Sequence, residues 1–539
     1  MFYTEPAPEA PPPLSRAEVF LVVVLLFAWM LPGLFGHEPW KPDEAYNFGL
    51  VYHMMKSGDW LTFHLPDEAP FAAPPLYYMT AAFFGKLLSP LFSLPDAMRL
   101  ATGFYMGIAL VFITLAGRIL YEKGRHAALI LAGSLGLLGH AHQLIPDSAL
   151  FAGCSMAICG FALFRKNAIQ GGLLTGTGMG IGFMSKGLIA PAFFLPVLIL
   201  LPVLRHPGRS YVLFVCAAIL SLLPWGIWPY LLHLDHPKLF SMWWESSFNL
   251  SLGLPVEPHR NPLFYAGVLP WFAWPTLPLA LLSFWQERKR LNEEKMLLPL
   301  LVFIVMLSVL SLTKTGRELY AMPMLLPLSL LATASLDRLK RSATSAFNWF
   351  GLLTFGMMAA ILWLGWIALM TGHPAYIAAR IHHYHPDFNA HFGLFPFLLA
   401  TGVTLLWMLL ISRTEHNGKR SVVNWTSGVV MTWAILMTIW LPFLDSVKGY
   451  REMFQSMKAA LPERYDCIEG RHLGDAQRAM LDYYLGIDTQ RRGSCELVLI
   501  QTVSSNRHHP EGLKKLWEGA RAGDRFERYR LYVRKKGAE

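Results

Sequence analysis

Several charged side chains stand at the ends of apolar segments, where they could do chemistry at a membrane surface. Asp43 and Glu44 follow the first apolar segment and are themselves followed by Tyr46. Asp147 stands at the start of another such segment, and three basic residues occupy similar positions, namely Lys186, Lys314 and Arg317. A carboxylate can act as a general base on an acceptor, and lysine or arginine can bind a phosphate and stabilise a leaving group. Such charges, gathered on one face of a helical bundle, are typical of a functional site.

The composition indicates the kind of protein that must position these side chains. Of the 539 residues, 54% are apolar and only 15% are charged, whereas soluble proteins carry about 25% charged residues. The chain is therefore predicted to be a polytopic helical membrane protein. Its net charge of +10 is assigned to basic loops that anchor helices on one face, so no nucleic-acid partner is expected. The first apolar segment has no small-residue cleavage site and is predicted to be retained as a helix.

Thirteen apolar segments are predicted to cross the bilayer as helices. They cover residues 17–36, 99–119, 126–145, 148–165, 171–185, 187–204, 211–233, 263–284, 297–313, 318–336, 346–371, 392–412 and 423–444. With this count, six clusters of Arg and Lys fall on one side, which the positive-inside rule identifies as cytoplasmic. The N-terminus is then cytoplasmic, and the acids and bases named above lie on the outer face with the C-terminal segment.

A further apolar segment, residues 74–94, would break this pattern if it crossed the membrane. It is therefore predicted to be an interfacial or re-entrant helix. Its aromatic residues suit the headgroup boundary, and they are Tyr77, Tyr78, Phe83 and Phe84.

The chain divides into a membrane domain, residues 1–444, and a polar C-terminal domain, residues 445–539. The first outer loop, residues 36–98, is long and carries the acidic pair. In the C-terminal domain, residues 451–461 and 473–485 are predicted helices, and residues 496–502 and 526–534 are predicted strands, which indicates a small α/β domain. Cys467 and Cys495 could form a disulfide if this domain lies in an oxidising compartment, and two free thiols are the alternative.

Structural roles could also explain these residues. Asp43 could cap a helix over residues 44–56, and Asp147 could cap the helix that follows it. Lys186 and Lys314 could be anchors that reach the membrane surface. His259 and Arg260 could be ordinary loop residues.

Two classes of function fit the charged residues. A transporter usually places ionisable groups near the middle of the membrane, on broken helices related by internal repeats. Here the charges cluster at helix ends and no repeat is found, which favours group transfer at the surface from a lipid-linked donor. A lipid or small-molecule transporter remains the alternative class, and a non-catalytic assembly partner is a third.

Nine short motifs, in this order, give the chain a family resemblance. They are Pro-Asp-Glu at residues 42–44 with Tyr46, Ser-Gly-Asp-Trp at 57–60, Pro-Pro-Leu-Tyr-Tyr at 74–78, Ile-Pro-Asp at 145–147, Ser-Lys-Gly at 185–187, Pro-Trp at 224–225, His-x-x-Pro-x-x-Tyr at 259–265, Leu-Pro-Trp at 269–271 and Ser-Leu-Thr-Lys-Thr at 311–315 with Tyr320 and Pro323. The chain resembles the GT-C superfamily of glycosyltransferases that use lipid-phosphate sugars. The nearest groups are the bacterial aminoarabinose transferases and the related family 39, which includes protein mannosyltransferases.

The resemblance implies a role for each matching residue. Asp43 matches the catalytic acid of the first periplasmic loop and would activate the acceptor, and Asp147 matches a second acid. The segments that line the donor cavity imply substrate-binding roles for Glu44, Tyr46, Tyr77, Lys186, Arg260, Lys314, Arg317 and Tyr320. His259 matches a histidine that binds a divalent metal ion in some members.

The chain departs from the family at two places. Members usually have an acid and a lysine before the Pro-Leu-Tyr-Tyr segment, whereas this chain has Ala72 and Ala73 before Pro74. An acid that helps to hold the metal and a lysine that contacts the donor phosphate are therefore missing. Ala45 also stands where the family has arginine before the tyrosine.

The sequence thus predicts an all-α polytopic membrane protein of GT-C type, with about thirteen transmembrane helices and a small periplasmic α/β domain. The resemblance implies a multi-pass enzyme of the bacterial inner membrane, surrounded by membrane lipids. It would transfer a sugar, such as 4-amino-4-deoxy-L-arabinose, from undecaprenyl phosphate to lipid A or another envelope glycolipid, with a protein as the alternative acceptor.

Overall fold

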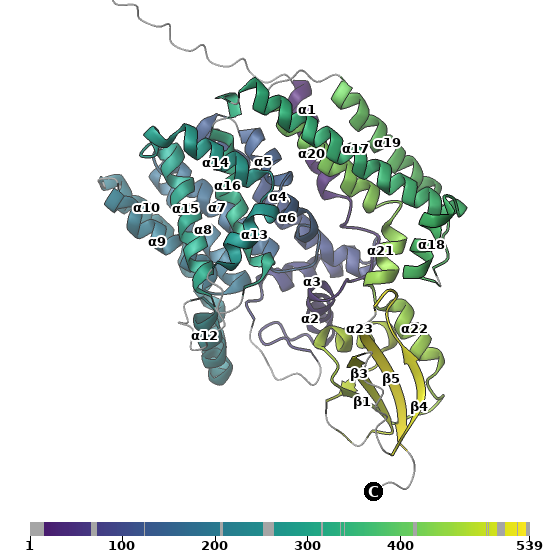
Figure 1. The fold of residues 1–539 in the computed structure, drawn as a ribbon. Helices are drawn as coiled ribbons and strands as arrows, with labels where there is room; N and C mark the ends of the chain where they lie inside the picture. The colour runs from purple at the N-terminus through teal and green to yellow at the C-terminus, as the bar shows by residue number, and fades with distance from the viewer. Residues whose placement is uncertain are drawn as a thin grey trace, which may run out of the picture.

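The structure, a computed structural model, is a bundle of helices with a small α/β domain at one end (Figure 1). It describes residues 16–65, 73–122, 124–204, 208–251, 263–313, 316–334, 336–338, 340–386, 388–412, 418–491, 493, 495–503, 512–524 and 526–534.

Helices form in every segment that was predicted to cross the membrane. They are α1 (Arg16–Met30), α4 (Leu94–Tyr121), α5 (Gly124–Ala132), α6 (Leu135–His140), α7 (Asp147–Leu163), α8 (Ala168–Lys186), α9 (Ile189–Leu204), α10 (Arg209–Leu222), η1 (Leu223–Gly226), α11 (Ile227–Asp235), α13 (Phe264–Phe272), α14 (Thr276–Gln286), α15 (Glu294–Leu312), η3 (Glu318–Met324), α16 (Leu325–Ala334), α17 (Arg341–Thr371), α19 (Leu394–Ser412), α20 (Gly418–Leu436) and α21 (Leu441–Lys448). Connecting helices are α2 (Asp43–Ser57), α3 (Leu76–Leu88), α12 (Pro237–Ser251), η2 (Arg288–Arg290), η4 (Leu336–Arg338) and α18 (Ala375–Tyr384).

Several of these helices are long and apolar enough to span a bilayer. Within the described residues there are 5 by length and composition, or up to 7 if two bent pairs each count as one span. One bent pair is α13 with α14, which meet at 101°. A multi-span membrane domain is therefore confirmed, and the count of thirteen crossings stays a prediction.

The segment predicted to cross at residues 126–145 is broken into two short helices. α5 has 9 residues and α6 has 6, whereas a crossing helix needs about 20. The break lies at Ser134, whose hydroxyl bonds the Ile130 carbonyl one turn back. α6 starts at Leu135 and ends at His140, which interacts electrostatically with Asp43.

α3 agrees with the interfacial interpretation in its length but not in its aromatic residues. Its 13 residues reach only about 20 Å, less than the hydrocarbon core of a bilayer, about 30 Å. Phe83 is exposed, but Tyr77 and Tyr78 are buried. The prediction that the two tyrosines face the headgroups is wrong, because α3 packs flat against α4 and encloses them.

The C-terminal domain is a mixed sheet with helices against it. Its strands are β1 (Ile468–Arg471), β2 (Thr489–Gln490), β3 (Leu497–Val503), β4 (Leu513–Gly519) and β5 (Glu527–Arg534), in the order β2-β1-β3-β5-β4. β1 is parallel to β2 and β3, whereas β5 is antiparallel to β3 and β4. The helices are α22 (Arg451–Ala459) and α23 (Asp475–Leu485). A disulfide joins Cys467 to Cys495 beside the first residues of β1 and β3.

This domain packs on α2, the helix that follows the first membrane segment (Figure 1). Gly49 of α2 touches Ala479 of α23 so closely that an added Cβ at Gly49 would lie 2.1 Å from the Ala479 Cβ. Two lysines make ion pairs across the same interface: Lys56 Nζ lies 2.8 Å from Asp482, and Lys41 Nζ lies 3.0 Å from Asp524. α2 is therefore held between the membrane helices and the C-terminal domain.

Candidate active site

Asp43 begins α2, and its carboxylate faces a loop from a distant part of the chain. Arg317 Nη2 donates to Asp43 Oδ2 at 2.6 Å. Pro42 occupies the N-cap position, so Asp43 is the first helical residue and does not cap the helix. The pKa of the Arg317 guanidinium is raised by its hydrogen bond to Asp43, so Arg317 remains fully charged. The Asp43 side chain keeps 33% of its surface exposed, which leaves it accessible to a substrate.

Asp147 begins α7 and forms a second ion pair. Lys186 Nζ, from the last residue of α8, lies 2.9 Å from Asp147 Oδ2. The N-cap of α7 is Pro146, so Asp147 is not an N-cap either. α7 and α8 are antiparallel neighbours in backbone contact, since a Cβ at Gly153 would lie 2.4 Å from the Gly178 carbonyl oxygen. This close packing brings the two charges together at the same end of the helix pair.

Tyr320 of η3 joins the two ion pairs. Lys186 Nζ lies 5.6 Å from the centre of its ring, and the Arg317 guanidinium carbon lies 5.8 Å from it. Both cations are therefore within cation–π range of the same aromatic ring. Four predicted site residues, Asp43, Asp147, Lys186 and Arg317, are thus brought together around Tyr320, a fifth.

A small cavity opens beside this cluster. Asp147, Lys186 and Tyr320 form its charged and polar end. Leu150, Ile189 and Phe193 form part of its apolar wall. A cavity with a charged end and an apolar wall matches a lipid phosphate at its head and an isoprenoid chain behind it.

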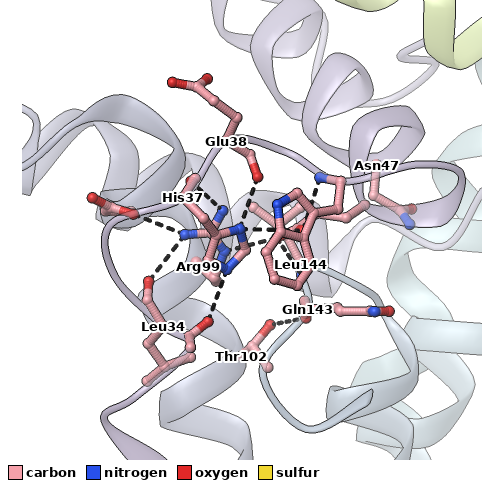
Figure 2. Close-up of polar contacts among 12 residues, drawn as sticks. Leu34, His37, Glu38, Asn47, Arg99, Thr102, Gln143 and Leu144 are labelled. Atoms are coloured by element: carbon pink, nitrogen blue, oxygen red, sulfur yellow. Dashed lines mark hydrogen bonds and ion pairs between the residues drawn. The ribbon is translucent and has the colours of Figure 1, made fainter. Parts of the chain in front are cut away.

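Glu44, which was predicted to bind substrate, is enclosed in a buried polar network centred on Arg99, which Figure 2 shows. Its carboxylate accepts hydrogen bonds from Arg99 Nε at 2.7 Å, from the Trp40 backbone N–H at 3.1 Å and from the Leu144 backbone N–H at 3.3 Å. Only 1% of its side-chain surface is exposed. Burial raises the pKa of Glu44, but Arg99 and the neighbouring donors outweigh burial and hold that pKa below its usual value. Glu44 therefore anchors the start of α2, and its predicted contact with substrate stays a prediction.

Arg99 is the centre of this network, and the sequence interpretation did not identify it. Its guanidinium also donates to Asp96 at 2.8 Å and to the backbone carbonyls of Leu34 and His37 at 3.1 and 3.0 Å. Figure 2 shows these contacts converging on the one side chain. A lone arginine near the start of the apolar segment 99–119 was the available signal, because such a residue needs buried partners.

Tyr77 also lies inside the fold, and its predicted substrate contact stays a prediction. Its hydroxyl lies 2.7 Å from Thr102 Oγ1, and Thr102 in turn donates to the Gln143 carbonyl at 2.8 Å. Tyr77 thus joins α3 to α4 and to the loop after α6. Tyr46 is half-buried on α2, one turn after Asp43.

His140, at the end of α6, is a further residue of the site that the sequence interpretation missed. Its ring is close enough to Asp43, Asp147 and Glu318 for electrostatic interaction with all three. It stacks against Phe272, with ring centres 6.1 Å apart. The sequence contains no clear signal for this role, because residues 126–145 form one apolar segment and the break between α5 and α6 is seen only in the structure.

The remaining predicted residues, His259, Arg260 and Lys314, lie outside the described residues. Among the described residues, no group of three His, Cys, Asp or Glu side chains is arranged to hold a metal ion. The donor set that is described does not fit a metal ion, so no step of a reaction is assigned to one.

The helix order, the C-terminal sheet and the charged end of the bundle define a membrane protein of the GT-C fold, as predicted. ArnT from Cupriavidus metallidurans has the same fold, with a TM-score of 0.65 in the apo state and 0.66 when bound to undecaprenyl phosphate. The apo structure is 16% identical in sequence, and the match covers 96% of this chain and 97% of that one.

The sequence itself is similar to the aminoarabinose transferases. It is 29% identical over 381 residues to the undecaprenyl phosphate-alpha-4-amino-4-deoxy-L-arabinose arabinosyl transferase of Pseudomonas aeruginosa strain UCBPP-PA14, with 65% of this chain and 66% of that protein matched. A second such protein, from Pseudomonas fluorescens strain Pf0-1, is 30% identical over 338 residues, with 58% of this chain and 56% of that protein matched. No family model matches the chain.

Proposed function

We propose that the protein is a membrane glycosyltransferase that takes a sugar from a polyprenyl phosphate. The observation that carries this proposal is the pair of ion pairs, Asp43 with Arg317 and Asp147 with Lys186, joined by Tyr320 at the charged end of an apolar-walled cavity. The carboxylates that could act on the acceptor and the cations that could bind the donor phosphate then lie within one cluster. A transporter would need neither this combination nor its position at helix ends.

The arrangement supports direct displacement at the anomeric carbon. The acceptor oxygen forms a bond to that carbon while the bond from the carbon to the phosphate oxygen breaks. The polyprenyl phosphate leaves with the electron pair, and Lys186 and Arg317 stabilise its charge. Asp43 orients the acceptor and takes its proton where the acceptor is protonated. One displacement inverts the configuration of the anomeric carbon.

The donor and acceptor are inferred from the relatives. The names of these relatives specify undecaprenyl phosphate and 4-amino-4-deoxy-L-arabinose, and one ArnT structure holds undecaprenyl phosphate. We infer the same donor class here, with lipid A or another envelope glycolipid as the acceptor. A protein acceptor, as in the mannosyltransferases of family 39, is the second candidate.

Mass spectrometry of envelope lipids tests this proposal. Cells that lack the gene should lose a glycosylated form of lipid A, and wild-type protein should restore it while Asp43→Asn should not. An unchanged lipid profile would reject the lipid A acceptor and direct the same comparison to envelope proteins. Restoration by Asp43→Asn would reject the catalytic assignment.

We further propose a bacterial inner-membrane location with the C-terminal domain in the periplasm. An oxidising compartment would maintain the disulfide between Cys467 and Cys495, which the fold places at bonding distance. Maleimide labelling of the denatured, non-reduced protein from cells should leave both cysteines unmodified. Labelling at both would place the domain in the cytoplasm and would remove the site from the periplasmic face.

A further inference from the structure

A second cavity, much larger than the first, lies at the opposite end of the same helices. Its volume is about 650 Å³. Phe161 and Phe164 line it near the end of α7, Ala168 at the start of α8, and Glu294 at the start of α15. The other ends of α7 and α8 carry Asp147 and Lys186, so the two cavities are separated by the length of these helices.

That separation is close to the thickness of a membrane. α8 has 19 residues and is therefore about 28 Å long, which is comparable with a hydrocarbon core of about 30 Å. The second cavity thus opens at the other membrane surface, out of reach of the reacting groups. By the predicted orientation it faces the cytoplasm, since Arg165 and Lys166 form one of the basic clusters that define that side.

The lining of this cavity has two parts. One part is polar and carries Arg165, Lys166 and Ser210, with Glu294 Oε2 placed 3.3 Å from Arg165 Nη1. The other part is apolar and consists of Phe161, Phe164, Leu201, Leu297 and Leu298. Two cations against one carboxylate leave an excess of positive charge at the rim. A ligand that complements both parts must be an anionic amphiphile.

We propose that this cavity binds an anionic glycerophospholipid, with the headgroup phosphate at Arg165 and Lys166 and the acyl chains against Phe164, Leu201 and Leu297. Basic pockets between membrane helices on the cytoplasmic side suit anionic headgroups. Inorganic phosphate would leave the apolar wall uncovered. The headgroup of phosphatidylcholine is zwitterionic, and its quaternary ammonium would approach Lys166 unfavourably. The site is separate from the catalytic cluster and does not depend on the proposed reaction.

Native mass spectrometry of the full-length protein, with phosphatidylglycerol or phosphatidylcholine of identical acyl chains, tests the proposal. Phosphatidylglycerol should bind more tightly by roughly tenfold or more, because each basic residue contributes to attraction of an anionic headgroup. The double variant Arg165→Gln/Lys166→Gln should lose this preference. Equal binding of the two lipids to the wild-type protein would overturn the proposal.

Two further variants separate a specific site from general surface charge. Arg288→Gln/Lys289→Gln removes two charges from another loop of the same predicted face, and it should retain the preference for phosphatidylglycerol. Leu297→Trp fills the apolar part without changing charge, and it should weaken binding of phosphatidylglycerol. Equal losses in both double variants, or full binding by Leu297→Trp, would reject the site.

Competition identifies the source of the phosphate. Millimolar inorganic phosphate should not displace bound phosphatidylglycerol, and undecaprenyl phosphate should displace it less effectively than a second phosphatidylglycerol does. Displacement by inorganic phosphate, or preferential binding of undecaprenyl phosphate, would overturn the assignment to a diacyl lipid. Thermal unfolding without added lipid is expected to be unchanged in all variants, which shows that losses of binding do not arise from misfolding.

Discussion

Asp43 and Glu44 are neighbours in the sequence but belong to two different regions of the molecule. Asp43 is partly exposed and pairs with Arg317, whose side chain is 45% exposed. Glu44 is enclosed and pairs with Arg99, and each of these side chains is only 1% exposed. One acid is placed where a substrate can reach it, and the other fixes the backbone that carries it. An acidic pair in a sequence therefore need not mean two acids in one site.

The largest difference between the two regions is expected when each acid is replaced by its amide. Asp43→Asn should reduce turnover by about 10²–10⁴-fold, the range for loss of a general base, with little change in thermal unfolding. Glu44→Gln should instead lower the unfolding temperature, because a neutral glutamine no longer balances the positive charge of the buried Arg99. Activity assays and unfolding curves in the same detergent measure both. If Glu44→Gln abolished turnover in a protein with unchanged stability, Glu44 would belong to the active site.

Removal of Arg99 tests the buried region alone. Arg99→Leu leaves the Glu44 carboxylate in a closed environment without its main partner, and such a loss costs about 3–5 kcal/mol of folding free energy. The double variant Glu44→Met/Arg99→Leu should recover part of that stability, since it removes both charges. Thermal unfolding of the two variants provides the measurement. Equal stability of the single and double variants would mean that the ion pair is not the stabilising element.

A substitution of Lys186 tests the part of the Tyr320 cluster that is proposed to bind the donor phosphate. Lys186→Gln should raise the KM for the polyprenyl-phosphate donor by about tenfold or more, because a charge-assisted contact to the phosphate is lost. Lys41→Gln removes the same charge from an ion pair with the C-terminal domain and is the matched control, with KM expected to stay close to that of the wild type. A larger effect of Lys41→Gln on KM would move the donor phosphate toward the C-terminal domain.

The smallest effect concerns the contact that holds the loop of Asp43 to the C-terminal domain. Burial raises the pKa of Asp524, but the backbone N–H groups of Phe526 and Glu527 and the Lys41 ammonium outweigh it and lower that pKa to about 2. Because the folded pKa lies below the unfolded value of 3.8, the stabilisation is complete above pH of about 4 and is lost as pH falls toward 2.

Unfolding of the wild type and of Asp524→Asn between pH 7 and pH 3 measures this contribution. The wild type should be more stable at pH 7, and the difference should shrink as pH falls below about 4. Asp475→Asn, at a more exposed position of the same domain, is the control. A difference that stays constant down to pH 3 would show that the Asp524 charge does not contribute.

The sequence was informative wherever a pattern is local. The C-terminal domain illustrates this, because α22, α23, β3 and β5 form in the predicted segments, although β1, β2 and β4 were not predicted. Short strands such as β2, with 2 residues, carry too little alternation to be recognised. The ordered motifs likewise led to the fold, and they contain Asp43, Asp147 and Lys186, whereas Arg317 was noted only as a charge at the end of an apolar segment.

Roles that depend on orientation could not be predicted in the same way. Glu44 stands in the same motif as Asp43, yet it is enclosed, with hydrogen bonds to Arg99 of α4 and to the Leu144 backbone in the loop after α6. His140 ends α6, a short helix that is separate from α5, whereas the sequence predicted one continuous helix over residues 126–145. No local pattern indicates which side of a short helix will be covered by a distant segment.

The sequence by itself determined the membrane class, the apolar segments and the residue types available for group transfer, since hydropathy and side-chain chemistry are properties of the chain alone. Only the tertiary structure decided which charges meet. It paired Asp43 with Arg317 across 274 positions and Glu44 with Arg99 across 55. The physical reason is that a buried charge must find a partner, whereas an exposed one need not, and burial depends on how the helices pack.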